Sequence, residues 1–207
     1  MNSLAQLLLD TGRPSEEAEI LSKEAIETHT AAFGAQSIEV SNDLSTLGGL
    51  YLARGQLQES EKAFRQSSAI FEKVFGPNHP LVARDLNNLA SVLRKRNKLD
   101  EAETTIRRAV RIEETCSGQD HPRVATRLMN LGDILQQRGQ EAQAEQAMRR
   151  AVTILENPGG RAHPNYAIAV NNLAELLKAT NRLPEVEPLL RRALVVAEHS
   201  FDPDHPA

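Results

Sequence analysis

One dipeptide recurs at a fixed interval, and this interval constrains the fold more than any other feature of the sequence. His-Pro occurs at residues 79–80, 121–122, 163–164 and 205–206, so consecutive copies lie 42 residues apart. One interval earlier the chain reads FGAQSIEV, which still parallels the later FGPNHPLV. A repeat of this length predicts an array of stacked units, in which each unit buries its apolar face against the next.

We therefore expect residues 1–207 to form a single repeat array. A terminal unit normally presents a polar outer face, and no polar capping helix follows the last His-Pro. This predicts either a fragment of a longer array or a capping helix supplied by another molecule. The expected repeats span approximately residues 1–37, 38–79, 80–121, 122–163 and 164–205, and residues 206–207 would open a further repeat.

Each repeat predicts two helices. Pro80 suits the first turn of a helix, where an amide N–H would have no partner. Asn97 is expected to end that helix, because Asn and Gly tolerate the left-handed conformation; Gly55, Gly139 and Asn181 hold the equivalent places. A second helix runs to about Thr115, and a later one beginning near Pro184 or Glu185 would keep Pro188 in its first turn. The apolar stripes of helical period are Val82, Leu86, Leu89, Ala90 and Leu93, then Leu99, Ala102, Ile106, Ala109 and Val110.

These patterns predict an all-α fold: a right-handed solenoid of about five antiparallel helix-turn-helix repeats. Hydrophobic residues make up 40% of the chain and aromatics only 3%, which suits closely packed helices with a core of Leu, Ala, Ile and Val. Glu precedes Arg by four residues on the second helix of four repeats, as in Glu61–Arg65 and Glu103–Arg107, and Glu19–Lys23 takes this place in the opening repeat. Such pairs contribute about 0.3–0.5 kcal/mol each, and we interpret them as a solvated face.

The small and large residues of the two helices are similar to the signature of the tetratricopeptide repeat. In the second repeat they are Leu47, Gly48, Tyr51, Gly55, Ser60, Phe64 and Ser67. The 42-residue period, with the sequences LNNLA, EAE…RRAV and DHP, resembles the kinesin-light-chain-like subgroup. The resemblance implies a protein-binding scaffold whose concave groove, lined by first-helix residues off the apolar stripe, holds an extended peptide.

A ladder of polar residues marks that groove. Carboxamides offer a donor and an acceptor to a peptide backbone, although they could instead bridge neighbouring repeats within the stack. The resemblance also implies an acidic-apolar peptide, towards which basic residues such as Arg84 and Lys95 would face. The expected ladder is Thr46, Asn88, Asn130 and Asn172, and the expected groove adds Arg84, Asn87, Ser91, Lys95, Asp133, Asn171 and Glu175, with Ser45 and Met129 beside Asn87 and Asn171 in the parallel row.

Catalysis, metals and cofactors are not expected. The sequence contains no Gly-rich phosphate loop, G-x-S-x-G or H-E-x-x-H motif. The repeated histidines would lie about 10 Å or more apart, too far to share a zinc ion with bonds of about 2 Å. We expect a structural role for His-Pro, with proline starting the helix.

The overall composition limits which classes of partner the chain can bind. A net charge of −4 argues against nucleic acid, and no apolar run approaches the ~18 residues of a membrane span. The single Cys116 fits a reducing compartment, so we expect a cytoplasmic protein. Two alternatives to peptide binding stay open: a regulatory or sensor array of a larger signalling protein, and a structural array that self-associates through its uncapped C-terminal end.

Overall fold

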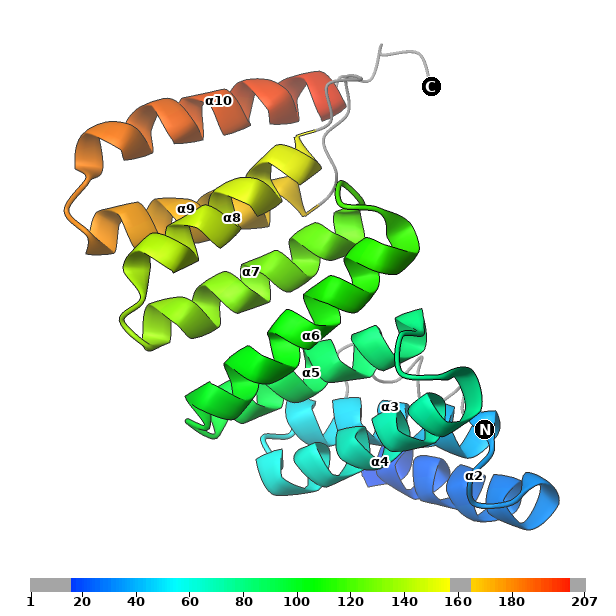
Figure 1. Ribbon diagram of the computed structural model, residues 1–207. Helices are drawn as coiled ribbons and strands as arrows, with labels where there is room; N and C mark the ends of the chain where they lie inside the picture. Colours follow the sequence, from blue (N-terminus) through cyan, green and yellow to red (C-terminus); the bar gives the residue numbers. More distant parts are fainter. Residues whose placement is uncertain (1–15, 157–164, 202–207) are drawn as a thin grey trace. The chain divides into compact units, whose positions relative to one another are not determined.

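The computed structural model describes residues 16–156 and 165–201, and these form nine α-helices and no strand (Figure 1). The expected first helix of the first repeat, and the histidines of the third and fourth His-Pro pairs, lie outside the described residues. The helices are α2 (Glu16–Phe33), α3 (Ile38–Ala53), α4 (Leu57–Phe75), α5 (Pro80–Lys95), α6 (Leu99–Ser117), α7 (Pro122–Gln137), α8 (Glu141–Leu155), α9 (Tyr166–Ala179) and α10 (Leu183–Phe201).

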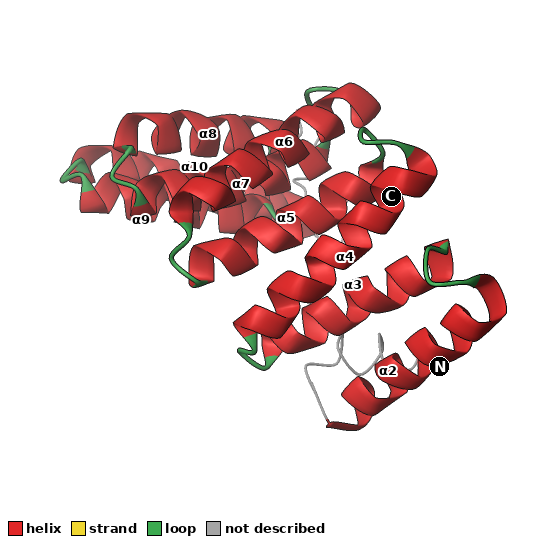
Figure 2. Ribbon diagram, turned by 60° about the horizontal axis from the view of Figure 1, so that its bottom comes forward, coloured by secondary structure: helices red, strands yellow, loops and turns green. Residues whose placement is uncertain are grey.

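The chain divides into two compact units, residues 1–112 (unit 1) and residues 113–207 (unit 2), and the boundary falls within α6. Short loops join consecutive helices into antiparallel hairpins, as α3–α4, α7–α8 and α9–α10 show (Figures 1 and 2). Within unit 1 the first helices α3 and α5 contact each other, and within unit 2 α7 contacts α9. The expected all-α repeat architecture is confirmed.

The two His-Pro pairs within the described residues start helices, as predicted for the proline, and the histidine contributes more than the sequence suggested. Pro80 and Pro122 occupy the first turns of α5 and α7. His79 and His121 are the N-cap residues: each Nδ1 atom accepts a hydrogen bond from the backbone amide two residues later, at 3.3 Å and 3.1 Å. The imidazole therefore satisfies one of the orphan amides at the helix start, a role usually taken by Ser, Thr, Asp or Asn.

The first helices end where the sequence predicted. Gly55 and Gly139 have φ values of 74° and 70°, and Asn97 and Asn181 both have φ of 59°. This left-handed conformation lets the chain reverse tightly into the second helix, and Gly and Asn adopt it at the lowest energetic cost.

The core consists of the predicted apolar stripes. Every residue of the stripe on α5 is buried, and on α6 only Leu99 at the helix start is half-buried. In the α7–α8 hairpin, the small residue of the first helix faces a side chain of the second helix at close range. A Cβ atom on Gly132 would lie 2.7 Å from Cγ of Met148, so a larger residue there would require the Met148 side chain to shift.

Pro188 corrects one expectation. Helix α10 begins at Leu183 rather than at Pro184 or Glu185, so Pro188 lies beyond its first turn. The proline has no N–H to donate to the carbonyl of Pro184 four residues earlier. The start one residue earlier follows from a 3.1 Å hydrogen bond from the amide of Glu185 to the carbonyl of Arg182, which closes the first turn.

Candidate peptide-binding surface

In unit 1, the expected groove residues lie on two first helices that contact each other. Thr46 is on α3 and the other five are on α5, facing away from its buried stripe. Thr46 is buried and Lys95 is exposed, and the remaining four, Arg84, Asn87, Asn88 and Ser91, are half-buried.

The two asparagines of α5 form a local polar patch. Nδ2 of Asn87 donates to Oδ1 of Asn88 at 3.4 Å, and the Ser91 hydroxyl donates to the backbone carbonyl of Asn87 at 3.2 Å. Each carboxamide carries two N–H donors and an oxygen that accepts two bonds, and both side chains are half-buried, so each is partly accessible from solvent. A partly solvated pair of this kind can pair with the N–H and C=O of a passing peptide.

Position 46 departs from the asparagine ladder. The Thr46 hydroxyl donates to the carbonyl of Asn42 at 3.1 Å within its own helix. Beside it, the Ser45 hydroxyl donates to both carboxylate oxygens of Asp85, at 2.9 Å and 2.7 Å. At this end of the ladder the polar groups serve the interior of the unit.

Arg84 is held in a fixed position on the same face. Its Nε donates to Oδ1 of Asp85 at 3.1 Å and its Nη2 donates to the Ser45 hydroxyl at 3.0 Å. The guanidinium carbon lies 5.4 Å from the centre of the Phe71 ring, within the range of a cation–π contact. The side chain is still 41% exposed, so it remains partly accessible from solvent.

Asp85 is the buried counterpart of this arginine. Burial raises the pKa of the Asp85 carboxyl, and Arg84, Ser67 and Ser45 oppose that rise by stabilising the carboxylate. The Ser67 hydroxyl of α4 donates to Oδ2 of Asp85, and it also bonds with the Ser41 hydroxyl of α3 at 3.0 Å. This carboxylate therefore links α3, α4 and α5 inside unit 1.

In unit 2, the expected residues again fall on two first helices in contact, α7 and α9. Asn130, Asp133 and Asn172 are half-buried, and Asn171 and Glu175 are exposed. Glu175 pairs with Lys178 at 3.2 Å, one turn further along α9. Met129, which parallels Asn87 in the repeat, is buried, so that parallel row of polar residues is interrupted in unit 2.

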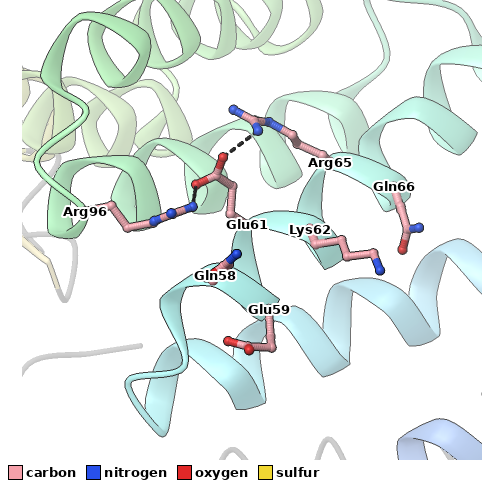
Figure 3. A pocket seen from close by; sticks show the side chains of 7 residues that line it. All are labelled: Gln58, Glu59, Glu61, Lys62, Arg65, Gln66 and Arg96. Atoms are coloured by element: carbon pink, nitrogen blue, oxygen red, sulfur yellow. Dashed lines mark hydrogen bonds and ion pairs between the residues drawn. The ribbon is translucent and has the colours of Figure 1, made fainter.

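The Glu–Arg pattern of the second helices corrects the expectation of a solvated face. The Glu61 side chain is only 4% exposed and binds Arg65 of its own helix. It also binds Arg96 from the turn after α5 (Figure 3), and it binds Lys98 from the same turn at 2.9 Å. Burial alone would raise the pKa of Glu61, but hydrogen bonds from Lys98 and Arg96 bring it below its usual value.

This arrangement, which we call the clamp, recurs along the chain. Glu19 pairs with Arg54, and Glu145 pairs with Arg182 at 2.5 Å, each partner again following the next first helix. A second set connects neighbouring second helices: Arg108 with Glu72 at 2.8 Å and Arg150 with Glu114 at 2.6 Å. The partners in these ion pairs lie 35–37 residues apart in the sequence. The i,i+4 pairs, taken alone, suggested a solvated surface.

The described residues form a shallow pocket, but they contain no metal site and no membrane-spanning helix. A shallow pocket lies beside the clamp on α4, and no group of three or more His, Cys, Asp or Glu side chains suited to a metal ion occurs among residues 16–156 and 165–201. Within that part of the chain, no helix has the length and apolarity to cross a membrane. The residues lining the pocket are Gln58, Glu59, Glu61, Lys62, Arg65, Gln66 and Arg96 (Figure 3).

Comparison with known proteins gives one family. The model of the tetratricopeptide repeat matches four overlapping stretches that together run almost the length of the chain. No curated protein matches the sequence significantly. The matched stretches are residues 1–73, 44–115, 86–157 and 125–199.

Solved structures share the fold at low sequence identity. The putative kinesin light chain TPR-like repeats of Podosopora anserina are 21% identical, with a TM-score of 0.80 over 97% of this chain and 95% of that one. BtubC (BKLC) from P. vanneervenii is 23% identical, with a TM-score of 0.82 over 99% and 80%. MamA is more distant, at 15% identity and a TM-score of 0.63 over 94% of each chain.

Proposed function

Because the chain belongs to the tetratricopeptide repeat family, whose members generally mediate protein–protein interactions, we propose that it is a scaffold that binds an extended segment of a partner protein. The binding surface is the polar face of its first helices. The fold shared with kinesin-light-chain-like repeats supports this proposal at the level of architecture. The family is generally non-enzymatic, and the proposed role requires no catalytic residue.

The observation that carries the proposal is the placement of partly exposed carboxamides on the first helices of each unit. Asn87 and Asn88 lie on α5, and Asn130, Asn171 and Asn172 lie on α7 and α9. An extended peptide has an unpaired N–H and C=O at every residue, and a carboxamide can bond to both whatever the peptide sequence. Amides placed in this way supply affinity that does not depend on the side chains of the partner.

Charges on α5 would then select among partners. The Arg84 side chain is partly exposed, and Lys95 is exposed at the end of the helix. An acidic-apolar segment would place carboxylates near these groups. Because the charges are partly in solvent, they contribute more to the association rate and to selectivity than to affinity, and their effect weakens with salt.

A peptide-library pull-down with the intact chain at two salt concentrations tests the proposal. The peptides recovered should be enriched in acidic residues at the lower salt concentration. The triple variant N88A/N130A/N172A should lose binding to them by at least an order of magnitude, while its helical circular dichroism stays unchanged. Its matched control, Q58A/Q66A/Q146A, removes three exposed amides from the second helices α4 and α8 and should bind as the wild type does. Equal binding by both triple variants would refute the proposed surface.

A second candidate function rests on the exposed apolar face of α10. Leu194 and Val195 are 60% and 52% exposed, whereas Ser68 and Val152, which are equivalent to Leu194 on α4 and α8, are buried. Both of those helices are packed against the following first helix, α5 and α9 respectively. Glu187 repeats Glu61 and Glu145 but is 70% exposed. The apolar side chains of this face could pack against an amphipathic helix, and Glu187 could pair with an arginine that follows that helix. We propose that a second copy of this chain supplies the helix and the arginine.

Sedimentation velocity over a range of concentrations tests this self-association. The wild type should dimerise, and Leu194→Gln should weaken dimerisation. Ile168→Gln, which removes an equally exposed apolar side chain from α9, should leave dimerisation unchanged. A wild type that remains monomeric at the highest concentration would rule out this second function and would leave the peptide-binding proposal unaffected.

A further inference from the structure

One buried position of the first helices carries a different type of residue in nearly every repeat. Residues 43, 85, 127 and 169 lie one repeat apart, and they are Asp, Asp, Arg and Ala. All four are buried. A charged side chain at a buried position is strongly unfavourable unless a specific partner compensates it, so each of the three charged residues requires its own environment.

The residue 14 positions earlier, on the preceding second helix, changes together with this position. Nδ1 of His29 lies 2.6 Å from Oδ2 of Asp43, and Nη2 of Arg127 lies 2.7 Å from Oε2 of Glu113. In the last repeat both positions are apolar and buried, Leu155 and Ala169.

The remaining repeat uses a different solution. Fourteen residues before Asp85 stands Phe71, which cannot pair with a carboxylate. Its ring instead carries the Arg84 guanidinium on its face, and that guanidinium bonds to Asp85. The hydroxyls of Ser67 and Ser45 supply the other hydrogen bonds to this carboxylate.

We propose that these four combinations, 29/43, 71/85, 113/127 and 155/169, are register pairs that restrict each first helix to its own preceding second helix. The apolar stripe alone cannot make this distinction, because it repeats every 42 residues; Leu47, Leu89, Leu131 and Leu173 are equivalent and all are buried. A hairpin displaced by one repeat, whether within one chain or onto another copy of the chain, would bury the same leucines in the same places.

A displaced arrangement would mismatch the buried charges. With a shift of one repeat, Asp85 opposite Glu113 would bury two carboxylates together, and Arg127 opposite Leu155 would bury a cation without a partner. Unpaired buried charges discriminate strongly between arrangements even where a matched pair adds little stability compared with apolar residues. The register pairs thus act on specificity, and they go beyond the proposed partner-binding role.

The proposal can be tested by measuring the exchange of hairpins between copies of the chain. A change in stability alone would not alter this measurement. Cys116 is the single cysteine of the sequence and is exposed, so one pool can be labelled there with a donor fluorophore and another with an acceptor. The two pools are refolded from denaturant either together or separately and then mixed. Energy transfer present only after joint refolding reports exchanged hairpins, whereas self-association through α10 gives transfer in both protocols.

Three double variants are compared with the wild type. E113L/R127A installs the apolar pair of the last repeat, and H29L/D43A does the same in unit 1; both should fold and show several-fold more exchange than the wild type. E113R/R127E reverses the pair and keeps a charged match, so it should refold with as little exchange as the wild type. Wild-type levels of exchange in both apolar variants would overturn the proposal. Failure of both to fold would also contradict it, because the same Leu–Ala combination packs between α8 and α9.

Discussion

The two units solve the same packing problem with different buried chemistry. In unit 1 the first helices α3 and α5 each bury an aspartate, held by His29 in one case and by two serines with Arg84 in the other. In unit 2, α7 buries an arginine against Glu113, and α9 buries an alanine. The backbone and the apolar stripes are alike, so one repeat architecture tolerates opposite charges at an equivalent position as long as the neighbouring helix changes with it.

The clamps differ less between units, and mainly in burial. Glu61 in unit 1 is 4% exposed and has three cationic partners, whereas Glu145 in unit 2 is 21% exposed and has two. Because solvent screens the second clamp more, it should contribute less to stability.

The largest expected effect comes from breaking the buried ion pair of unit 2. Arg127→Met leaves the Glu113 carboxylate buried without its main partner and should lower the free energy of unfolding by about 3–5 kcal/mol. Chemical denaturation measures this change. Arg123→Met is the control, because Arg123 lies 3.5 Å from the same carboxylate but is 58% exposed, so its loss should cost less than about 1 kcal/mol. Equal losses for the two variants would show that burial does not set the strength of this pair.

A smaller effect is expected from the clamps. Glu61→Gln removes a charge that accepts from three cations and should destabilise the protein by about 1.5–3 kcal/mol, while Glu145→Gln should cost less. Denaturation of both variants, with Glu187→Gln at the 70% exposed position as the neutral reference, gives the ranking. The reverse order would mean that burial of the carboxylate does not govern the clamp.

The smallest effect is a pH dependence from the buried Asp85 of unit 1. Burial raises the pKa of Asp85 above the usual 3.8, so the folded protein holds a proton at pH values where the unfolded chain has released it. The contribution of this group to stability is therefore most favourable below pH 3.8 and is lost as the pH rises through the raised pKa. The stability of the wild type relative to Asp85→Asn should accordingly increase as the pH falls from 7 towards 4. A difference that is constant with pH, measured by denaturation at several pH values, would contradict this account.

Much of the fold could be predicted from the sequence, because it follows from local rules that repeat. The proline at the start of α5, the left-handed Asn97 at its end and the leucine stripe between them each have a short-range cause. Because the pattern repeats every 42 residues, the helix assignment made for one repeat could be applied to the others.

The buried polar contacts could not be predicted in the same way, because their partners lie on other helices. Asp85 looks like any polar residue of an amphipathic helix until α3 and α4 bring Ser45 and Ser67 against it. The N-cap role of His79 was missed because histidine is a rare cap, and the burial of Glu61 was missed because its i,i+4 partner already explained it. The changing residue types at positions 43, 85, 127 and 169 were the one available signal.

The most direct test of the central claim is a nuclear magnetic resonance titration of the side-chain amide groups with a peptide recovered from the library. The account predicts that the largest shifts belong to Asn87, Asn88, Asn130, Asn171 and Asn172 on the first helices, while Gln58, Gln66 and Gln146 on the second helices remain unchanged. Shifts confined to the glutamines of the second helices, with the asparagines unaffected, would contradict it.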